Sequence, residues 1–262
     1  MNPKTALTRL GAVVVAGGLA VAFAGGAFAG PAFAADSPTS TVTPGTSNAT
    51  QISNLRQKCE TAITNRLASI ATATGAVQGA AHLTSGDRST LLTQIGNEKT
   101  GLSALGDKIA GDTDLQTLRA DCKNIVAEYH WYIIGIPKVH LTIAADDAAA
   151  VVGTLQDLST RLQDDIDRSQ ARGRNVTQAQ ADENALNAAI SSGQNAAAPV
   201  PALVLPLAFD NWTAAQPVLQ SARTDLGNAR TDFSNARTDA KKVIADLRAL
   251  IPTPVAVTPT AH

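Results

Sequence analysis

Aromatic residues are scarce in this chain, and this absence limits the kind of core it can build. Only 3% of the 262 residues are Phe, Trp or Tyr, and there is a single methionine. The hydrophobic share of 44% therefore consists mostly of Ala, Leu, Val and Ile. Alanine is the best helix former and loses no side-chain entropy on burial. The composition favours closely packed helices over a two-layer β-sheet fold.

An excess of one charge is also missing. The 21 basic and 22 acidic residues give a net charge of −1 and are mixed along the chain. Because nucleic-acid-binding proteins carry clustered basic residues, we expect no nucleic-acid partner.

Signatures of catalysis and of metal binding are absent from the sequence. There is no Gly-x-Ser-x-Gly, no glycine-rich phosphate loop and no pair of histidines at ligand spacing. Asp146-Asp147 and Asp164-Asp165 lie in helical patterns, where adjacent side chains diverge instead of converging on an ion. We therefore expect a non-enzymatic protein with no cofactor and no bound metal.

The N-terminus has the features of a secretory signal. Lys4 and Arg9 accompany an apolar stretch rich in Gly and Ala, and Ala32-Phe33-Ala34 has the small-x-small pattern of a cleavage site. Residues 1–34 are thus predicted to be a signal peptide, with residues 27–29 as a second cleavage site. A retained anchor is the alternative, although the glycine content suits a signal peptide better. We expect a secreted or extracytoplasmic protein with no transmembrane segment after cleavage. The sequence leaves open whether the protein is associated with the cell wall.

The two cysteines, Cys59 and Cys122, suggest a disulfide in an exported protein. Two buried free thiols are the alternative, and the sequence leaves open whether a bond would be intramolecular. A helical layout places both cysteines on apolar seams at similar height, which permits the bond without requiring it.

Helical spacing of apolar residues dominates between two Ser/Thr/Pro-rich ends. Residues 35–50 are predicted to be a disordered leader and residues 252–262 a disordered tail. The spacing predicts a helix over 51–80, a second over 86–110 with Ser85 as its N-cap, and a third from residue 115 to Gly173. Pro137 should kink this third helix, although two helices with a tight joint fit nearly as well. A shorter helix is predicted over 177–196, opened by a capping box at Thr177.

Three glycines lie inside the second predicted helix, at Gly96, Gly101 and Gly106. Glycine costs about 1 kcal/mol relative to alanine in an exposed helix. We therefore expect another element to be pressed against this helix.

The last predicted helix, from Pro217 to Leu250, has the clearest pattern, because Ala-Arg-Thr-Asp occurs three times at a seven-residue period. Apolar residues three and four apart form a coiled-coil seam. We expect antiparallel packing against the helix holding Leu155 to Ile166, with the Arg and Asp of each repeat pairing across the seam. An external partner helix is the alternative. The seam residues are Leu219, Ala222, Leu226, Ala229, Phe233, Ala236, Ala240, Val243, Leu247 and Leu250.

These elements predict an all-α fold, an elongated antiparallel helical bundle or coiled coil. Residues 51–135 and 138–251 would form two sub-bundles joined by a long kinked helix.

The rare large polar and aromatic residues gather at this kink, which makes it the candidate binding site. One interpretation is a site for a sugar, an apolar ligand or a protein, and Tyr and His can also ligate haem iron. The other is that large side chains fill the gap around a bent helix. The residues singled out are Tyr129, His130, Trp131, Tyr132, Lys138 and His140.

Residues 55–250 resemble a group of exported, Ala-rich helical proteins of high-G+C Gram-positive bacteria. The resemblance is based on Tyr129-x-x-Tyr132, Pro137-Lys138, Ala144-Ala145-Asp146 and the Ala-Arg-x-Asp repeats. It implies an extracytoplasmic helical protein and implies no activity, so it assigns no functional residue.

Two functional hypotheses follow. The first is a secreted or envelope-associated protein that acts through helix-mediated contacts with a protein or an envelope component. The second is an extracytoplasmic carrier or chaperone for apolar ligands or clients, suggested by the apolar sequence VLPLAF at residues 204–209.

Overall fold

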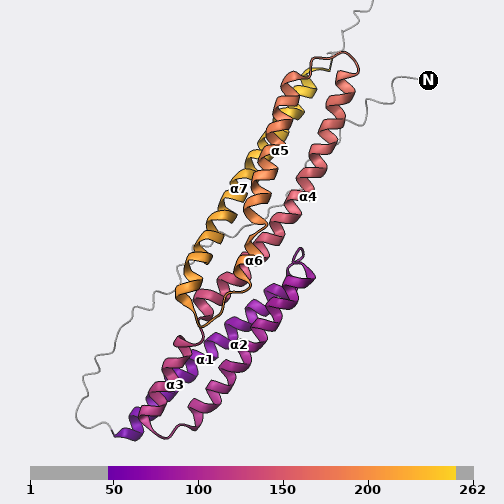
Figure 1. The fold of residues 1–262 in the computed structure, drawn as a ribbon. Coiled ribbons are helices and arrows are strands. Elements are labelled where there is room, and N and C mark those ends of the chain that lie inside the picture. The colour runs from indigo at the N-terminus through magenta and orange to yellow at the C-terminus, as the bar shows by residue number, and fades with distance from the viewer. Residues whose placement is uncertain (1–46, 252–262) are drawn as a thin grey trace, which may run out of the picture. The chain divides into compact units, whose positions relative to one another are not determined.

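The structure, a computed structural model, describes residues 47–251, and within that range the chain forms helices and no strand (Figure 1). The predicted all-α class is confirmed. The predicted signal peptide, the leader up to residue 46 and the tail at 252–262 lie outside the described residues.

Eight helical elements follow one another along this range. They are α1 (Asn48–Gly79), α2 (Ser85–Gly111), α3 (Leu115–Ala127), the π-helical turn η2 (Trp131–Gly135), α4 (Ile136–Gln170), α5 (Thr177–Ala197), α6 (Val200–Val204) and α7 (Trp212–Ala249).

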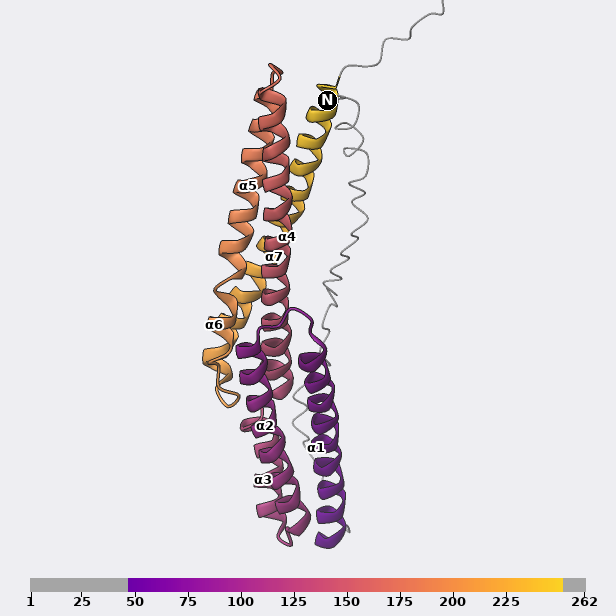
Figure 2. The ribbon, with the colours of Figure 1, turned by 90° about the vertical axis from the view of Figure 1, so that its right-hand side faces the viewer.

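The helices α1, α2 and α3 pack on one another (Figures 1 and 2). α1 begins before the predicted residue 51, because the side chain of Ser47 caps it by accepting a hydrogen bond from the main-chain N–H of Thr50. The predicted leader therefore extended too far, since residues 48–50 are helical. The core between these helices contains Cys59, Ile63, Leu105, Ile109, Leu118 and Ile125.

The start of α2 differs from the prediction by one residue. Thr84, and not Ser85, is the N-cap, and its Oγ1 accepts a hydrogen bond from the main-chain N–H of Asp87 at 3.1 Å.

The expected close neighbour of α2 is present at two of its three glycines. A Cβ on Gly101 would lie 2.7 Å from the hydroxyl of Tyr129, and one on Gly106 would touch Ile63 at 3.6 Å. Nothing lies within 4 Å of such an atom on Gly96. Close packing therefore explains Gly101, whereas a Cβ on Gly106 would make only an ordinary contact and Gly96 has no structural account.

The predicted long helix is interrupted before Pro137, not at it. α3 ends at Ala127, and the main-chain N–H of His130 donates to the carbonyl oxygen of Phe209, outside the helix, at 3.2 Å. Pro137 lies in the first turn of α4, where a missing N–H leaves no intrahelical bond unmade. Two helices joined through η2 therefore describe this region better than one kinked helix.

The seam predicted on the last helix is buried. α7 packs on both α5 and α4, whereas the sequence pointed to α4 (Figures 1 and 2). Nine of the ten predicted seam residues are buried, and Leu250 is half-buried. Gly193 of α5 faces the ring of Phe233 so closely that a Cβ there would collide with it. Small residues thus let α5 and α7 approach closely.

Two helix starts in this half differ from the predictions. Thr177 is the first residue of α5 and not its cap, and its main-chain N–H donates to Asn175 Oδ1 at 3.1 Å, so the predicted capping box does not form. α7 begins at Trp212, ahead of Pro217, because Asn211 caps it by accepting from the N–H of Ala214.

Hydrogen bonds join the first three helices to the later ones. Trp131 Nε1 donates to Ser69 Oγ at 3.0 Å, and the main-chain N–H of Thr84 donates to Asp146 Oδ2 at 2.8 Å. The division into sub-bundles at residues 51–135 and 138–251 stays a prediction.

Candidate functional site

The turn η2 positions the largest side chain of the predicted site inside the protein. Trp131 is fully buried, and its ring lies against Gly135, where a Cβ would collide with the ring. Its ring centroid is 6.1 Å from that of Phe209. Trp131 therefore fills the space at the bend, as the second interpretation of this cluster expected.

Lys138 is the most unusual residue of the site, because its side chain is only 1% exposed. Its ammonium group donates to Gln94 Oε1 at 2.9 Å and to the carbonyl oxygen of Leu205 at 3.2 Å. It also donates to the carbonyl oxygen of Leu207. All three hydrogens therefore have acceptors, which offsets much of the cost of burying an ammonium group.

Two further groups complete the surroundings of Lys138. The ring of Phe209 lies 4.4 Å from Nζ, close enough for a cation–π interaction. Glu98 of α2 is 6% exposed, and its Oε1 has no hydrogen-bond partner. We call Lys138, Gln94, Glu98 and Phe209 the Lys138 cluster.

Burial moves both charged groups of the Lys138 cluster toward their neutral forms. It raises the pKa of Glu98 to about 7, against the attraction of Lys138 and with a smaller contribution from Asp210. It lowers the pKa of Lys138 to about 8, against the attraction of Glu98. Glu98 and Lys138 are therefore both close to the pH at which each gains or loses a proton, and this pH is near neutrality.

The chain between α6 and α7, residues 205–211, covers the Lys138 cluster, and we call it the crossing segment. Besides its two carbonyl contacts with Lys138, it is held by His130, whose Nδ1 lies 2.8 Å from the carbonyl oxygen of Phe209. Since a carbonyl oxygen can only accept, this contact requires the tautomer with a hydrogen on Nδ1. The polar groups of the bend thus serve to hold the crossing segment in place.

The remaining predicted site residues lie elsewhere around the bend. Tyr129 is half-buried against Gly101, and burial raises the pKa of its hydroxyl. Tyr132 is exposed, with the guanidinium of Arg66 5.2 Å from its ring centroid. His140 lies at the surface on α4. The six residues therefore do not converge on one binding pocket.

The sequence did not indicate Gln94 or Glu98 as site residues, and Phe209 was noted only as part of the apolar sequence at residues 204–209. Glu98 could have been found, because it occupies the heptad position between the buried Ile95 and Leu102 of α2. An acid at a core position predicts a buried partner. Phe209 gave no such signal, since its contact with His130 joins residues 79 apart in sequence.

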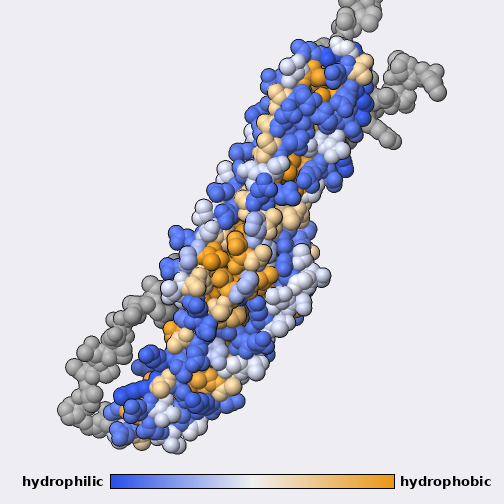
Figure 3. Space-filling view, viewed as in Figure 1, coloured by the Kyte–Doolittle hydropathy of each residue, from blue (hydrophilic) through white to orange (hydrophobic). Residues whose placement is uncertain are grey.

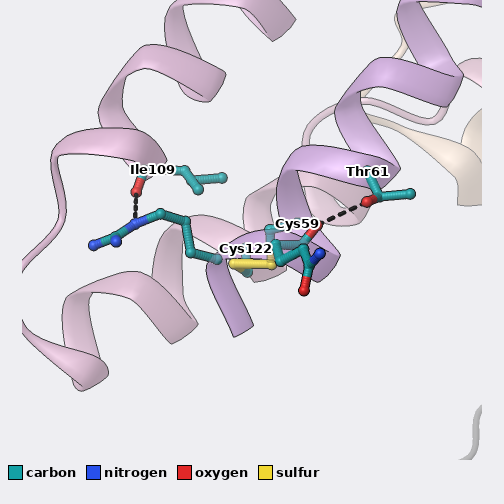
Figure 4. The surroundings of a disulfide bond; sticks show 6 residues. Cys59, Thr61, Ile109 and Cys122 are labelled. Atoms are coloured by element: carbon teal, nitrogen blue, oxygen red, sulfur yellow. Dashed lines mark hydrogen bonds between the residues drawn. A yellow bond between two sulfur atoms is a disulfide. The ribbon is translucent and has the colours of Figure 1, made fainter. Parts of the chain in front are cut away.

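The two cysteines form the predicted disulfide within the chain, joining α1 to α3 with Cα atoms 5.6 Å apart (Figure 4). Arg56, from the same turn of α1 as Cys59, donates through Nε to the carbonyl oxygen of Ile109 at 3.3 Å, so α1 is also tied to α2 here.

A shallow groove of about 250 Å³ runs between α4 and α5. Its lining includes Ala145, Val152, Gly153, Ala197 and Gln156. Most of the lining residues are small and apolar, and none of them is titratable. Among residues 47–251, no three His, Cys, Asp or Glu side chains converge where they could hold a metal ion.

Comparisons with models of protein families, with curated proteins and with solved structures found no match for this chain. The resemblance to exported helical proteins of high-G+C Gram-positive bacteria therefore stays a prediction. Of the helices that the structure describes, none is long and apolar enough to cross a membrane.

Proposed function

We propose that this chain is an exported, non-enzymatic protein that acts through contacts between its helix surfaces and a protein or a component of the cell envelope. The observation that carries the proposal is a set of apolar side chains left on the surface around the bend. Val126 is 59% exposed, Ile133 40% and Tyr132 36%. We call these three residues the bend surface.

The polar chemistry beside the bend surface is directed inward, which supports a contact role. Lys138 donates to acceptors of the protein itself, and His130 is engaged by the carbonyl oxygen of Phe209. What the bend offers to a partner is therefore apolar and aromatic area, the kind of surface that anchors protein contacts.

The disulfide supports the exported location within this proposal. Disulfides persist in oxidising compartments and are rare in the cytosol, so the Cys59–Cys122 bond is compatible with a protein outside the cytoplasm.

We further propose that α7 forms an antiparallel coiled coil with α5, whereas the repeats were predicted to pair with the helix that holds Leu155 to Ile166, which is α4. Ser192 Oγ donates to Asp232 Oδ2 at 2.7 Å, and Asp182 lies beside Asp246. Residue numbers thus rise along α5 as they fall along α7 at these two contacts. Such a paired framework would hold the contact surfaces rigid.

The experiment is co-sedimentation of the purified protein with cell envelopes isolated from its source, for the wild type and two single variants. Ile133→Ser changes the bend surface, and Leu203→Ser changes an exposed leucine of α6 that is 46% exposed. We expect the wild type and Leu203→Ser to sediment with the envelopes, and Ile133→Ser to remain in solution. Equal recovery of all three proteins in the soluble fraction would contradict the proposal.

A second candidate function, a carrier or chaperone, is supported by the region around α6. Figure 3 shows hydrophobic side chains gathered on the surface over α6, where Leu203 is exposed. The groove between α4 and α5 adds apolar area nearby. If the protein is a carrier or chaperone, we expect it to slow the aggregation of an unfolded client. Leu203→Ser should weaken this effect, whereas Ile133→Ser should slow aggregation as well as the wild type does. The same two variants therefore separate the two functions.

A further inference from the structure

Buried carboxylate oxygens without a hydrogen-bond donor recur in residues 47–251. They are Glu98 Oε1, Asp112 Oδ2, Asp121 Oδ2 and Asp246 Oδ2. An ionised carboxylate that is buried without a donor is costly, whereas a protonated carboxyl group is neutral and can itself donate. The geometry therefore suggests that some of these groups hold a proton in the folded protein.

The first pair lies at the turn between α2 and α3. Asp112 and Asp121 are 9% and 3% exposed, and their carboxyl groups are within hydrogen-bonding reach of each other. The facing cations are Lys108 of α2, whose Nζ is 2.8 Å from Asp121 Oδ1, and Arg56 of α1, which donates to the main-chain oxygen of Asp112. Neither cation donates to the two Oδ2 atoms, so a proton shared between the carboxyl groups would supply the hydrogen bond that both lack.

A second pair joins α5 to α7. The carboxyl groups of Asp182 and Asp246 are within hydrogen-bonding reach, and Asp246 Oδ2 is buried without another partner. Gln178 Nε2 donates to Asp182 Oδ2 at 3.3 Å, and Lys242 is paired with Asp239 at 2.6 Å, although its charge also acts on Asp182. The ammonium group of Lys242 is thus engaged by Asp239.

A third pair joins α2 to α4. Asp146 is 7% exposed, accepts from the main-chain N–H of Thr84, and lies within hydrogen-bonding reach of Asp87. The charge of Asp147 also raises the pKa of Asp146, and His82 is close enough to Asp147 to act against the increase in its pKa. Each of the three pairs therefore bridges two different elements.

We propose that these three carboxyl pairs act as proton-dependent ties between helices, so that they hold the protein together most firmly in acidic surroundings and loosen as the pH rises. When the shared proton leaves, two negative charges face each other at a site that is at least half-buried, and the bridge becomes a repulsion. The inference is independent of the proposed function.

The direction of the pH effect follows from proton linkage. Burial is the largest cause that raises the pKa of Asp112, Asp146 and Asp246, and the neighbouring carboxyl group raises each further. Glu98, which faces Lys138 and Asp210, moves in the same direction, from 4.5 to about 7. At these groups the folded protein binds more protons than the unfolded chain, so that the stability they contribute is complete below about pH 4 and is lost as the pH rises through their folded-state pKa values.

The test is urea unfolding of the full chain at about pH 5 and about pH 7.5, with Asp112→Asn and Asp246→Asn as single variants. Asparagine keeps the shape of a protonated aspartate and supplies a donor at every pH. We expect the wild-type unfolding constant to be at least about tenfold smaller at the lower pH. In each variant the pH dependence of the unfolding free energy should be weaker, and should correspond to up to one fewer proton exchanged on unfolding. Asp157→Asn, an exposed acid of α4, is the matched control and should keep the wild-type dependence.

Stability that is equal at the two pH values, or greater at the higher one, would overturn the proposal. So would equal pH slopes for the wild type and both pair variants. If a variant does not fold, amide hydrogen exchange of the wild type decides instead. After correction for intrinsic rates, exchange at the α2–α3 turn and along α5 and α7 should be faster at the higher pH. If the protection of these amides is the same at both pH values, the carboxyl pairs do not act as proton-dependent ties.

Discussion

Lys138 shows how much a single charged side chain can determine at the bend. It is as buried as the leucines of the core, yet it holds a charge that only acceptors from other elements can compensate. Those acceptors come from α2 and from the crossing segment, so one ammonium group fixes three parts of the chain. A buried group of this kind stabilises strongly only while all its partners remain.

We expect Lys138→Met to lower the free energy of unfolding by about 3 kcal/mol. Methionine keeps much of the stem but leaves Gln94 Oε1 and the carbonyl oxygen of Leu207 without this donor. It also leaves the buried Glu98 without the positive charge of Lys138. Urea unfolding at neutral pH measures the loss. Lys99→Met, an exposed lysine of the same helix as Glu98, is the control and should change stability little. Equal losses in the two variants would show that the contacts of Lys138 contribute nothing specific.

At the scale of the element, the start of α2 shows how a cap connects a helix to its neighbour. Thr84 caps the helix with its side chain, while its own N–H donates to Asp146 of α4. In an ordinary capping box the third helical residue would accept that N–H. Here Asp87 holds that position in the helix, and a carboxyl group from α4 accepts instead.

Substitution of Thr84 by alanine should lower the free energy of unfolding by about 1 kcal/mol, because the N–H of Asp87 loses its acceptor. Ser85→Ala is the matched control, one residue along, and should be close to neutral because Ser85 is already helical. Thermal and urea unfolding of both variants give the comparison. A larger loss of stability for Ser85→Ala than for Thr84→Ala would indicate that Ser85 is the N-cap, as predicted from the sequence.

The helices themselves could be predicted because their signal is local. The seam of α7 follows from residues three and four apart, and its burial agrees with that pattern at Leu219, Phe233 and Val243. The break at residues 128–130 could not be predicted, because it depends on the carbonyl oxygen of Phe209, distant in sequence. For the same reason the candidate site was predicted by composition at Lys138, while its partners in α2 and the crossing segment were not.

At the scale of the whole molecule, the disulfide is the one covalent constraint among residues 47–251. It joins residues 63 apart, and the loop that it closes contains all of α2, including Gln94 and Glu98 of the Lys138 cluster. The constraint acts mainly on the unfolded chain, whose freedom it reduces.

Replacing both cysteines by serine should lower the free energy of unfolding by about 4 kcal/mol in the chain-entropy model. Unfolding of the oxidised wild type, the reduced wild type and the double variant in urea measures this loss. The reduced wild type is the control, and it should match the variant closely because both lack the closed loop. If the oxidised and reduced proteins unfold at the same urea concentration, the bond does not stabilise the fold.

The same bond changes how the protein would respond to mechanical tension. Pulled from its two ends, the chain can extend α4, α5 and α7, but the stretch between Cys59 and Cys122 is bypassed by a covalent link. That stretch would otherwise add about 200 Å of contour length at about 3.3 Å per residue. The force would pass directly from α1 into α3 and onward to the bend. α2, the partner of Lys138, would carry none of it along its backbone.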